Sequence, residues 1–104
     1  MKLIQFKLVT IICEPGLKNS IVDLSQELGC TGFTITEVKG QGNGEKSGGE
    51  IPDEKLKIEI VLELQLAEKL MERLAASYFE NYSVITYAAD VSVLRPSKFE
   101  SEKS

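Results

Sequence analysis

Residues 55–64, KLKIEIVLEL, constrain the fold more than any other stretch of the chain, because apolar and charged side chains alternate there with Val61 as the one exception. This alternation predicts a strand with one buried face and one polar face. The apolar face is expected to carry Leu56, Ile58, Ile60, Leu62 and Leu64. The other face is expected to carry Lys55, Lys57, Glu59 and Glu63.

The rest of the chain predicts three more strands and two helices. The strands are residues 2–12, 32–38 and 83–94, which are rich in β-branched and alternating apolar residues. The first helix is expected to start at the EPG of residues 14–16 and to stop at Gly29, with a buried stripe of Leu17, Ile21, Leu24 and Leu28. The second helix follows residue 64, and its buried stripe is Leu66, Leu70, Met71 and Leu74.

The element order β-α-β-β-α-β predicts an α+β fold, the ferredoxin-like plait. Two right-handed crossovers place both helices on one face of a four-stranded antiparallel sheet. We expect a single domain over residues 1–95, with a long connection at about 40–54 and a polar, disordered C-terminal tail at 96–104. The other sheet face is left bare. Val9, Ile11, Val61 and alternate residues of VITYAADVSVL are expected there, which favours self-association through this face.

Composition excludes several function classes. The net charge of −4 argues against nucleic acid as a partner, because no basic stripe is available to neutralise phosphates. The chain has no histidine, so the commonest metal ligand and proton-transfer group is absent, and we expect neither a metal site nor an enzyme. Cys13 and Cys30 are expected to be reduced, partly buried thiols. No apolar run is long enough to span a bilayer, so a cytoplasmic protein without membrane insertion is expected.

Five of the eight glycines fall between Gly40 and Gly49, inside the long connection. A hairpin usually needs two to five loop residues, whereas this connection has about fifteen. Glycines let backbone N–H groups approach an anion, so this segment is a candidate phosphate-binding loop that orders when a ligand binds. It matches neither the Walker pattern nor a GxGxxG that opens a helix, and a flexible hairpin is the alternative.

Two strands carry a resemblance to a known family. GFTITEVKG at residues 32–40, followed by Gly42, resembles the second-strand signature of the PII signalling proteins, which leads into their T-loop. KLKIEIVL at 55–62 resembles the strand by which that family leaves the loop, and ASYFENYS at 76–83 resembles a run in PII-like proteins of the SbtB type, which regulate bicarbonate transport. The resemblance implies a homotrimer whose open sheet faces meet around the three-fold axis.

The resemblance also implies an adenine-nucleotide site in each cleft between subunits. Thr34 would lie beside the adenine, against a wall of Ile60, Val61 and Leu62. Gly40 and Gly42 would offer N–H groups to phosphate, and Arg95 would reach the nucleotide. The full implied set is Thr34, Gly40, Gln41, Gly42, Lys46, Ile60, Val61, Leu62, Tyr82, Ser83 and Arg95.

Departures from the family pattern bear on the preferred nucleotide. Asn43 and Gly44 stand where PII proteins have Arg-Gln. Residues 80–83 stand where PII proteins have a glycine-rich loop that contains a phosphate-binding lysine. Each charge-assisted contact is worth about 1.5–3 kcal/mol, so AMP, ADP or cyclic AMP is expected to be favoured over ATP. Residues 40–54 contain no tyrosine to accept a uridylyl group, and the tail lacks paired cysteines.

The implied function is a non-enzymatic regulator that senses adenine nucleotides and controls a partner through its T-loop. The expected partner is a membrane bicarbonate transporter or another carbon-uptake protein, with bicarbonate as a further candidate ligand. Two alternatives remain open at this stage. One is a CutA-like trimeric metal-tolerance or structural protein. The other is an enzyme, such as a phosphohydrolase, in which Glu37 and Glu59 on adjacent strands act as acid and base.

Overall fold

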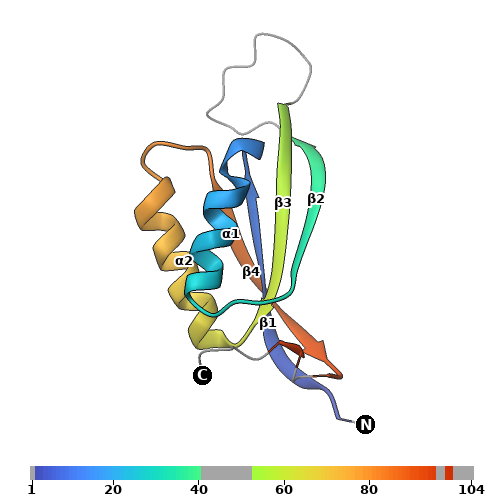
Figure 1. Cartoon of the computed structure of the whole chain (residues 1–104). Coiled ribbons are helices and arrows are strands. Elements are labelled where there is room, and N and C mark those ends of the chain that lie inside the picture. Colours follow the sequence, from blue (N-terminus) through green and yellow to red (C-terminus); the bar gives the residue numbers. More distant parts are fainter. Residues whose placement is uncertain (1, 41–52, 96–97, 100–104) are drawn as a thin grey trace.

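The computed structural model describes residues 2–40, 53–95 and 98–99. Its elements, in chain order, are β1 (Ile4–Cys13), α1 (Lys18–Glu27), β2 (Phe33–Gly40), β3 (Asp53–Leu62), α2 (Leu64–Tyr78) and β4 (Ile85–Val93). The strands form one antiparallel sheet in the order β2-β3-β1-β4. Both helices cover the same side of this sheet (Figure 1). The predicted α+β ferredoxin-like plait is therefore confirmed.

The first helix ends where the sequence predicts, and the reason is a glycine in the left-handed region. Gly29 has φ 97°, a conformation that costs little without a Cβ. Its N–H donates to the Gln26 carbonyl, and the Cys30 N–H donates to the Ser25 carbonyl, both at 3.0 Å. These two bonds form a Schellman motif. They satisfy carbonyls at the end of α1 and turn the chain toward β2.

The core lies between the helices and β1 and β3. From β3 it takes Leu56, Ile58, Ile60 and Leu62, as the alternation predicts, whereas Leu64 is the first residue of α2 and is exposed. Ile21 and Leu24 of α1 are buried, and Leu17 and Leu28 pack against the core at its edge. The buried side chains of α2 are Leu66, Ala67, Leu70, Leu74 and Tyr78, with Met71 partly buried.

The predicted side assignment of β1 is wrong. Val9 and Ile11 are fully buried in the core beneath the helices, because they lie opposite Ile60 and Ile58 of β3. The open face of β1 instead carries the alternate residues, which are Ile4, Phe6, Leu8, Thr10 and Ile12. In the second half of β1 both sets are apolar apart from Thr10, so alternation alone cannot tell them apart there. The register against β3 decides, since a one-residue shift moves every side chain to the other face.

The open face is nevertheless apolar over β1 and β4, whereas over β2 and β3 it also carries Thr34, Lys57 and Glu59. Val61 lies there opposite Leu8 of β1. On β4 the same face carries Tyr87 opposite Thr10 and Ile85 opposite Ile12, and both side chains are 49% exposed. Exposed side chains of this size on one sheet face are typical of an interface.

Residues 4–6 of β1 pair with residues 91–93 of β4 but not with β3, and this two-stranded ribbon extends beyond the helices (Figure 1). Polar pairs join the ribbon on one face. Lys7 forms an ion pair of 2.5 Å with Asp90, and Gln5 donates a hydrogen bond of 2.7 Å to the Ser92 hydroxyl. On the other face the Phe6 ring packs against Phe99, which follows the strand.

Candidate functional site

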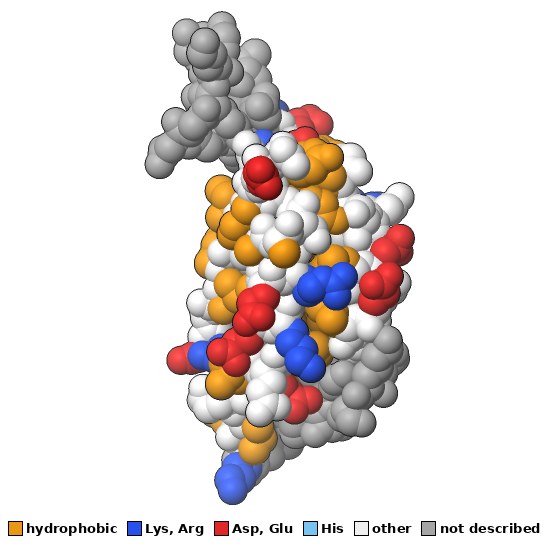
Figure 2. Space-filling view, turned by 90° about the vertical axis from the view of Figure 1, so that its left-hand side faces the viewer, with side chains coloured by type: hydrophobic (Ala, Val, Ile, Leu, Met, Phe, Trp, Pro, Cys, Tyr) orange, Lys and Arg blue, Asp and Glu red, His pale blue; other side chains and the backbone are white. Residues whose placement is uncertain are grey.

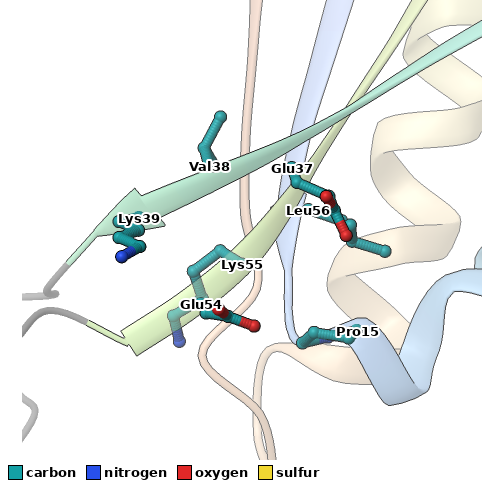
Figure 3. Close-up of a pocket in the computed structure, with 7 residues that line it drawn as sticks. All are labelled: Pro15, Glu37, Val38, Lys39, Glu54, Lys55 and Leu56. Atoms are coloured by element: carbon teal, nitrogen blue, oxygen red, sulfur yellow. The ribbon is translucent and has the colours of Figure 1, made fainter.

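A pocket lies at the base of the long connection, where β2 ends and β3 begins. The turn after β1 approaches the two strands at this place. The register of the hairpin closes with Gly40 opposite Asp53, and the chain leaves the sheet between these two residues. The pocket has a volume of about 310 Å³ and is lined by Pro15, Glu37, Val38, Lys39, Glu54, Lys55 and Leu56 (Figure 3). This volume matches the lower end of small-molecule sites.

The lining combines two lysines with two glutamates. Glu37 and Leu56 lie opposite one another and point toward the helices, whereas Val38 points away from them (Figure 3). Lys39 lies opposite Glu54 at the rim nearest the connection, and both side chains are exposed. Lys55 is 8% exposed. Such a rim can hold a small anion through lysine, while the carboxylates disfavour a highly charged one.

Gly40, which the sequence assigns to phosphate binding, follows the lining residue Lys39 at the last position of β2. A Cβ built on Gly40 would meet no described heavy atom within 4 Å, so packing within the protomer does not demand a glycine there. The backbone is open to approach from outside. Gln41, Gly42 and Lys46, the other loop residues of the predicted set, lie outside the described residues.

Thr34 and Val61 share the open face of the sheet. Thr34 is exposed on the edge strand β2 and lies opposite Glu59, two residues before Val61. Ile60 and Leu62 point the other way and are 0% and 1% exposed. A wall made of all three side chains is therefore not available to a ligand. Val61 can supply a side chain, and its two neighbours can supply only backbone groups.

The remaining predicted residues lie at opposite ends of the molecule. Ser83 precedes β4 at the end where Ile85 lies opposite Ile12, and Arg95 follows β4 at the end where Val93 lies opposite Ile4. Those ends are separated by the length of β4, or about 26 Å at roughly 3.3 Å per residue. Both side chains are exposed. One protomer therefore does not bring the predicted set together.

Tyr82 belongs to the helix side of the molecule. Its ring meets that of Tyr78 edge to face, with centroids 5.9 Å apart, and its N–H donates to the Tyr78 carbonyl at 2.9 Å. With Ser20, Asp23 and Arg73 it lines an open groove between the helices. Acidic and basic side chains are interspersed on this side, with no large patch of one sign (Figure 2).

The strand register excludes the acid–base pair considered from the sequence. Glu37 lies opposite Leu56 and so shares the helix side of the sheet, whereas Glu59 lies opposite Thr34 on the open face. Side chains on opposite faces of one sheet cannot act together on one substrate. Among the described residues, no group of three or more His, Cys, Asp or Glu side chains is arranged to hold a metal ion.

The two cysteines are free, as predicted, and both are buried more completely than the partial burial expected from the sequence. Burial raises the pKa of the Cys30 thiol to about 11. Burial also raises the pKa of Cys13, with a smaller contribution from the Glu14 carboxylate, while Lys55 acts in the opposite direction. Both thiols are therefore protonated and poorly reactive near neutral pH.

Sequence reasoning missed Lys39 and Lys55, which both line the pocket, and considered Lys46 as the only cation of the loop. The signal was present: each lysine lies within two residues of the place where its strand meets the connection. Counting residue pairs along the hairpin from both strands places both lysines at the same end of the sheet, with Lys39 opposite Glu54 and Lys55 opposite Val38.

Comparison with known proteins identifies the class to which this plait belongs. Residues 6–98 match the family described as nitrogen regulatory protein P-II. The chain belongs to the P-II family, and it is a PII-like signalling protein. No helix within the described residues is both long and apolar enough to cross a membrane.

Solved structures agree with this assignment. A PII-like signalling protein from Thermus thermophilus is 32% identical, with a TM-score of 0.80 over 95% of this chain and 99% of that one. CPII from Thiomonas intermedia, bound to ADP and bicarbonate, is 30% identical, with a TM-score of 0.81 over 94% and 97%. CPII bound to ADP, AMP and acetate is 29% identical, with a TM-score of 0.81 over 96% and 99%. The predicted resemblance to PII-like proteins of the SbtB type is supported by CPII.

Proposed function

We propose that this chain is a non-enzymatic regulator that senses adenine nucleotides in the clefts between subunits of a homotrimer. The observation that carries the proposal is the likeness to CPII over nearly the whole of both chains, because CPII holds ADP with bicarbonate in one structure and ADP with AMP in another. The loop-base pocket and the open backbone at Gly40 give a nucleotide phosphate a place to bind.

A trimer explains why the proposed ligands are scattered over one protomer. The apolar open face, with Ile85 and Tyr87 half exposed, needs a cover, and a second copy offers the same apolar surface. Association through this face brings different ends of neighbouring subunits together. Arg95 of one subunit can then reach the cleft beside Thr34 and Gly40 of the next.

Within that cleft we assign the adenine to Thr34 and Val61, with backbone groups of Ile60 and Leu62 beside them. We assign the phosphate to Gly40, Gln41, Gly42 and Lys46 at the base of the loop, and Lys39 at the pocket rim is a further phosphate ligand. Tyr82, Ser83 and Arg95 contribute from the ends of β4. AMP, ADP or cyclic AMP is favoured over ATP, because Glu37 and Glu54 at the pocket oppose a third phosphate.

The output of the sensor is a protein contact made by the T-loop, residues about 40–54 of a domain that spans 1–95. A nucleotide can shift the loop only by binding one of its conformations more tightly than another. The proposed partner is a membrane bicarbonate transporter or another carbon-uptake protein, with bicarbonate as a second ligand near the loop. The sites of action are the cytoplasm and the cytoplasmic surface of the transporter.

The test is calorimetric titration of the purified protein with AMP, ADP, ATP and cyclic AMP, each with and without bicarbonate. Micromolar binding of AMP, ADP or cyclic AMP, with weaker binding of ATP, supports the proposal. The variant Lys39→Gln should lower the affinity for ADP more than the affinity for AMP, because ADP carries one more phosphate for the lysine to bind. Lys18→Gln, at an exposed lysine of α1, is the matched control. No heat with any nucleotide would refute the sensor function.

A further inference from the structure

Phe6 is a buried aromatic residue that does not belong to the main core. It is 6% exposed, yet it is absent from the hydrophobic cluster that joins the helices to β1 and β3. Its place is the open face of β1, opposite Val91, on the ribbon that extends past the helices. Something other than the helices therefore shields it from water.

A segment beyond β4 provides part of that shield. The Phe99 ring packs against Phe6, with centroids 6.0 Å apart and planes at 61°, an edge-to-face geometry that aromatic pairs prefer. Four residues before it, the Arg95 carbonyl accepts a hydrogen bond of 3.0 Å from the Lys98 N–H. This bond closes a turn between Arg95 and Lys98 directly after the last strand, and Phe99, the next residue, packs against the sheet.

From this arrangement we infer that Phe99 is a positioning residue for Arg95, the arginine assigned to the nucleotide. The inference rests on the proposed function. Arg95 is exposed and stands two residues beyond β4, where its backbone would otherwise be free to leave the ribbon in many directions. The turn and the Phe6–Phe99 contact restrict that direction before any ligand arrives.

Restricting a flexible contact residue in advance strengthens binding, because less conformational entropy is lost when the ligand is held. Phe99 does not need to touch the nucleotide for this effect. If Phe99 acts by positioning Arg95, its effect on affinity must depend on the presence of Arg95. This dependence distinguishes positioning from a general contribution of Phe99 to stability. Removal of the ring should matter only while the guanidinium is present.

The experiment is a double-mutant cycle on ADP affinity, measured by calorimetry on the full chain. We expect Arg95→Ala to weaken ADP by at least about tenfold, as for a lost charge-assisted contact. Phe99→Ala should weaken ADP by about fivefold to tenfold. In the Arg95→Ala background the same change should have less than about a twofold effect. Phe99→Tyr keeps the ring and should restore wild-type affinity.

Three further variants serve as controls for the test. Phe79→Ala removes the same ring from a site that is 49% exposed at the end of α2, and it should leave ADP affinity unchanged. Phe6→Leu and Phe99→Leu weaken the aromatic contact with less risk to folding, and both should reduce affinity in the direction of Phe99→Ala. Size-exclusion chromatography with light scattering should show an unchanged mass for every variant.

The outcomes separate the two claims. If the wild-type protein binds no adenine nucleotide, both the proposed function and this inference fail; if it binds AMP or cyclic AMP but not ADP, the same cycle is measured with that nucleotide. If ADP binds and Arg95→Ala weakens it, but Phe99→Ala does not, only the inference fails. Equal effects of Phe99→Ala with and without Arg95 would also overturn it. A loss of mass in Phe99→Ala would assign the residue to assembly and overturn positioning.

Discussion

The hydroxyl of Tyr78 on α2 is hydrogen-bonded to the hydroxyl of Ser20 on α1, and this bond joins the two helices on the covered side of the sheet. Tyr78 is 7% exposed, so its hydroxyl has little access to water. We expect Tyr78→Phe to lower the free energy of unfolding by about 0.5–1.5 kcal/mol, the net value of a typical hydrogen bond. Urea denaturation measures it. Tyr82→Phe, at a residue 45% exposed, is the control and should change little.

The second prediction concerns the adenine end of the proposed site. Thr34→Val keeps the shape and β-propensity of the side chain but removes its hydroxyl from the exposed edge strand. We expect ADP affinity to fall by about threefold to tenfold through the loss of one hydrogen bond, with no loss of thermal stability. Thr36→Val is the matched control, because Thr36 is exposed on the same face two residues further along β2, opposite Lys57. Equal effects of both changes would contradict the assignment of Thr34.

The third prediction concerns assembly through the open face. Thr10 of β1 lies between Tyr87 of β4 and Glu59 of β3 on the open face of the sheet. Tyr87→Glu therefore adds a carboxylate to this face close to Glu59. A covered face disfavours an unpaired charge. Light scattering should therefore show the mass falling from three times 11.5 kDa toward 11.5 kDa.

Leu64→Glu is the control for that experiment. Leu64 is 54% exposed at the start of α2, where a negative charge favours the helix end, and the trimer mass should persist. A trimer that survives Tyr87→Glu would show that the subunits do not meet through the open face.

The fourth prediction follows from the buried thiol of Cys30, whose pKa is raised by burial from 9.0 to about 11. Below pH 9 the folded and unfolded states both keep the proton. Between pH 9 and 11 only the unfolded state loses it, so the free energy of unfolding falls as the pH rises. The fall is about 1–3 kcal/mol, since one pKa unit is worth about 1.4 kcal/mol.

Urea denaturation at about pH 8 and about pH 10.5 measures this change, and Cys30→Ala is the comparison. Other groups titrate in the same range, so the informative quantity is the difference between the wild-type protein and the variant. Stability should fall less with pH in Cys30→Ala. Parallel pH profiles would show that the thiol does not contribute.

The sequence predicted the elements and their order because each carries its own local signal, such as the alternation of β3 or the glycine that ends α1. It failed where two segments must be compared. Val9 and Ile11 were assigned to the wrong face because β1 is apolar on both sides, and Glu37 and Glu59 were paired although the register separates them. Lys39 and Lys55 were missed for the same reason, since their proximity depends on how two strands align.

The candidate site could be predicted less fully than the fold. The assignments of Thr34 and Gly40 stay predictions, whereas Ile60 and Leu62 are turned into the core and cannot form a side-chain wall. Tyr82 and Arg95 belong to different regions of one protomer. A site shared between copies leaves little trace in one chain, because its residues need no common strand, helix or sequence spacing.

The two apolar faces of β1 have a further consequence. Helices cover one face of β1, whereas most of the other face is left for a second copy to cover. The same strand is therefore buried partly by folding and partly by association. By mass action, the stability of such a protein rises with its own concentration. The midpoint of thermal unfolding should therefore be higher in concentrated than in dilute samples. When two preparations of the protein are mixed, their subunits should exchange no faster than the open face of β1 becomes exposed.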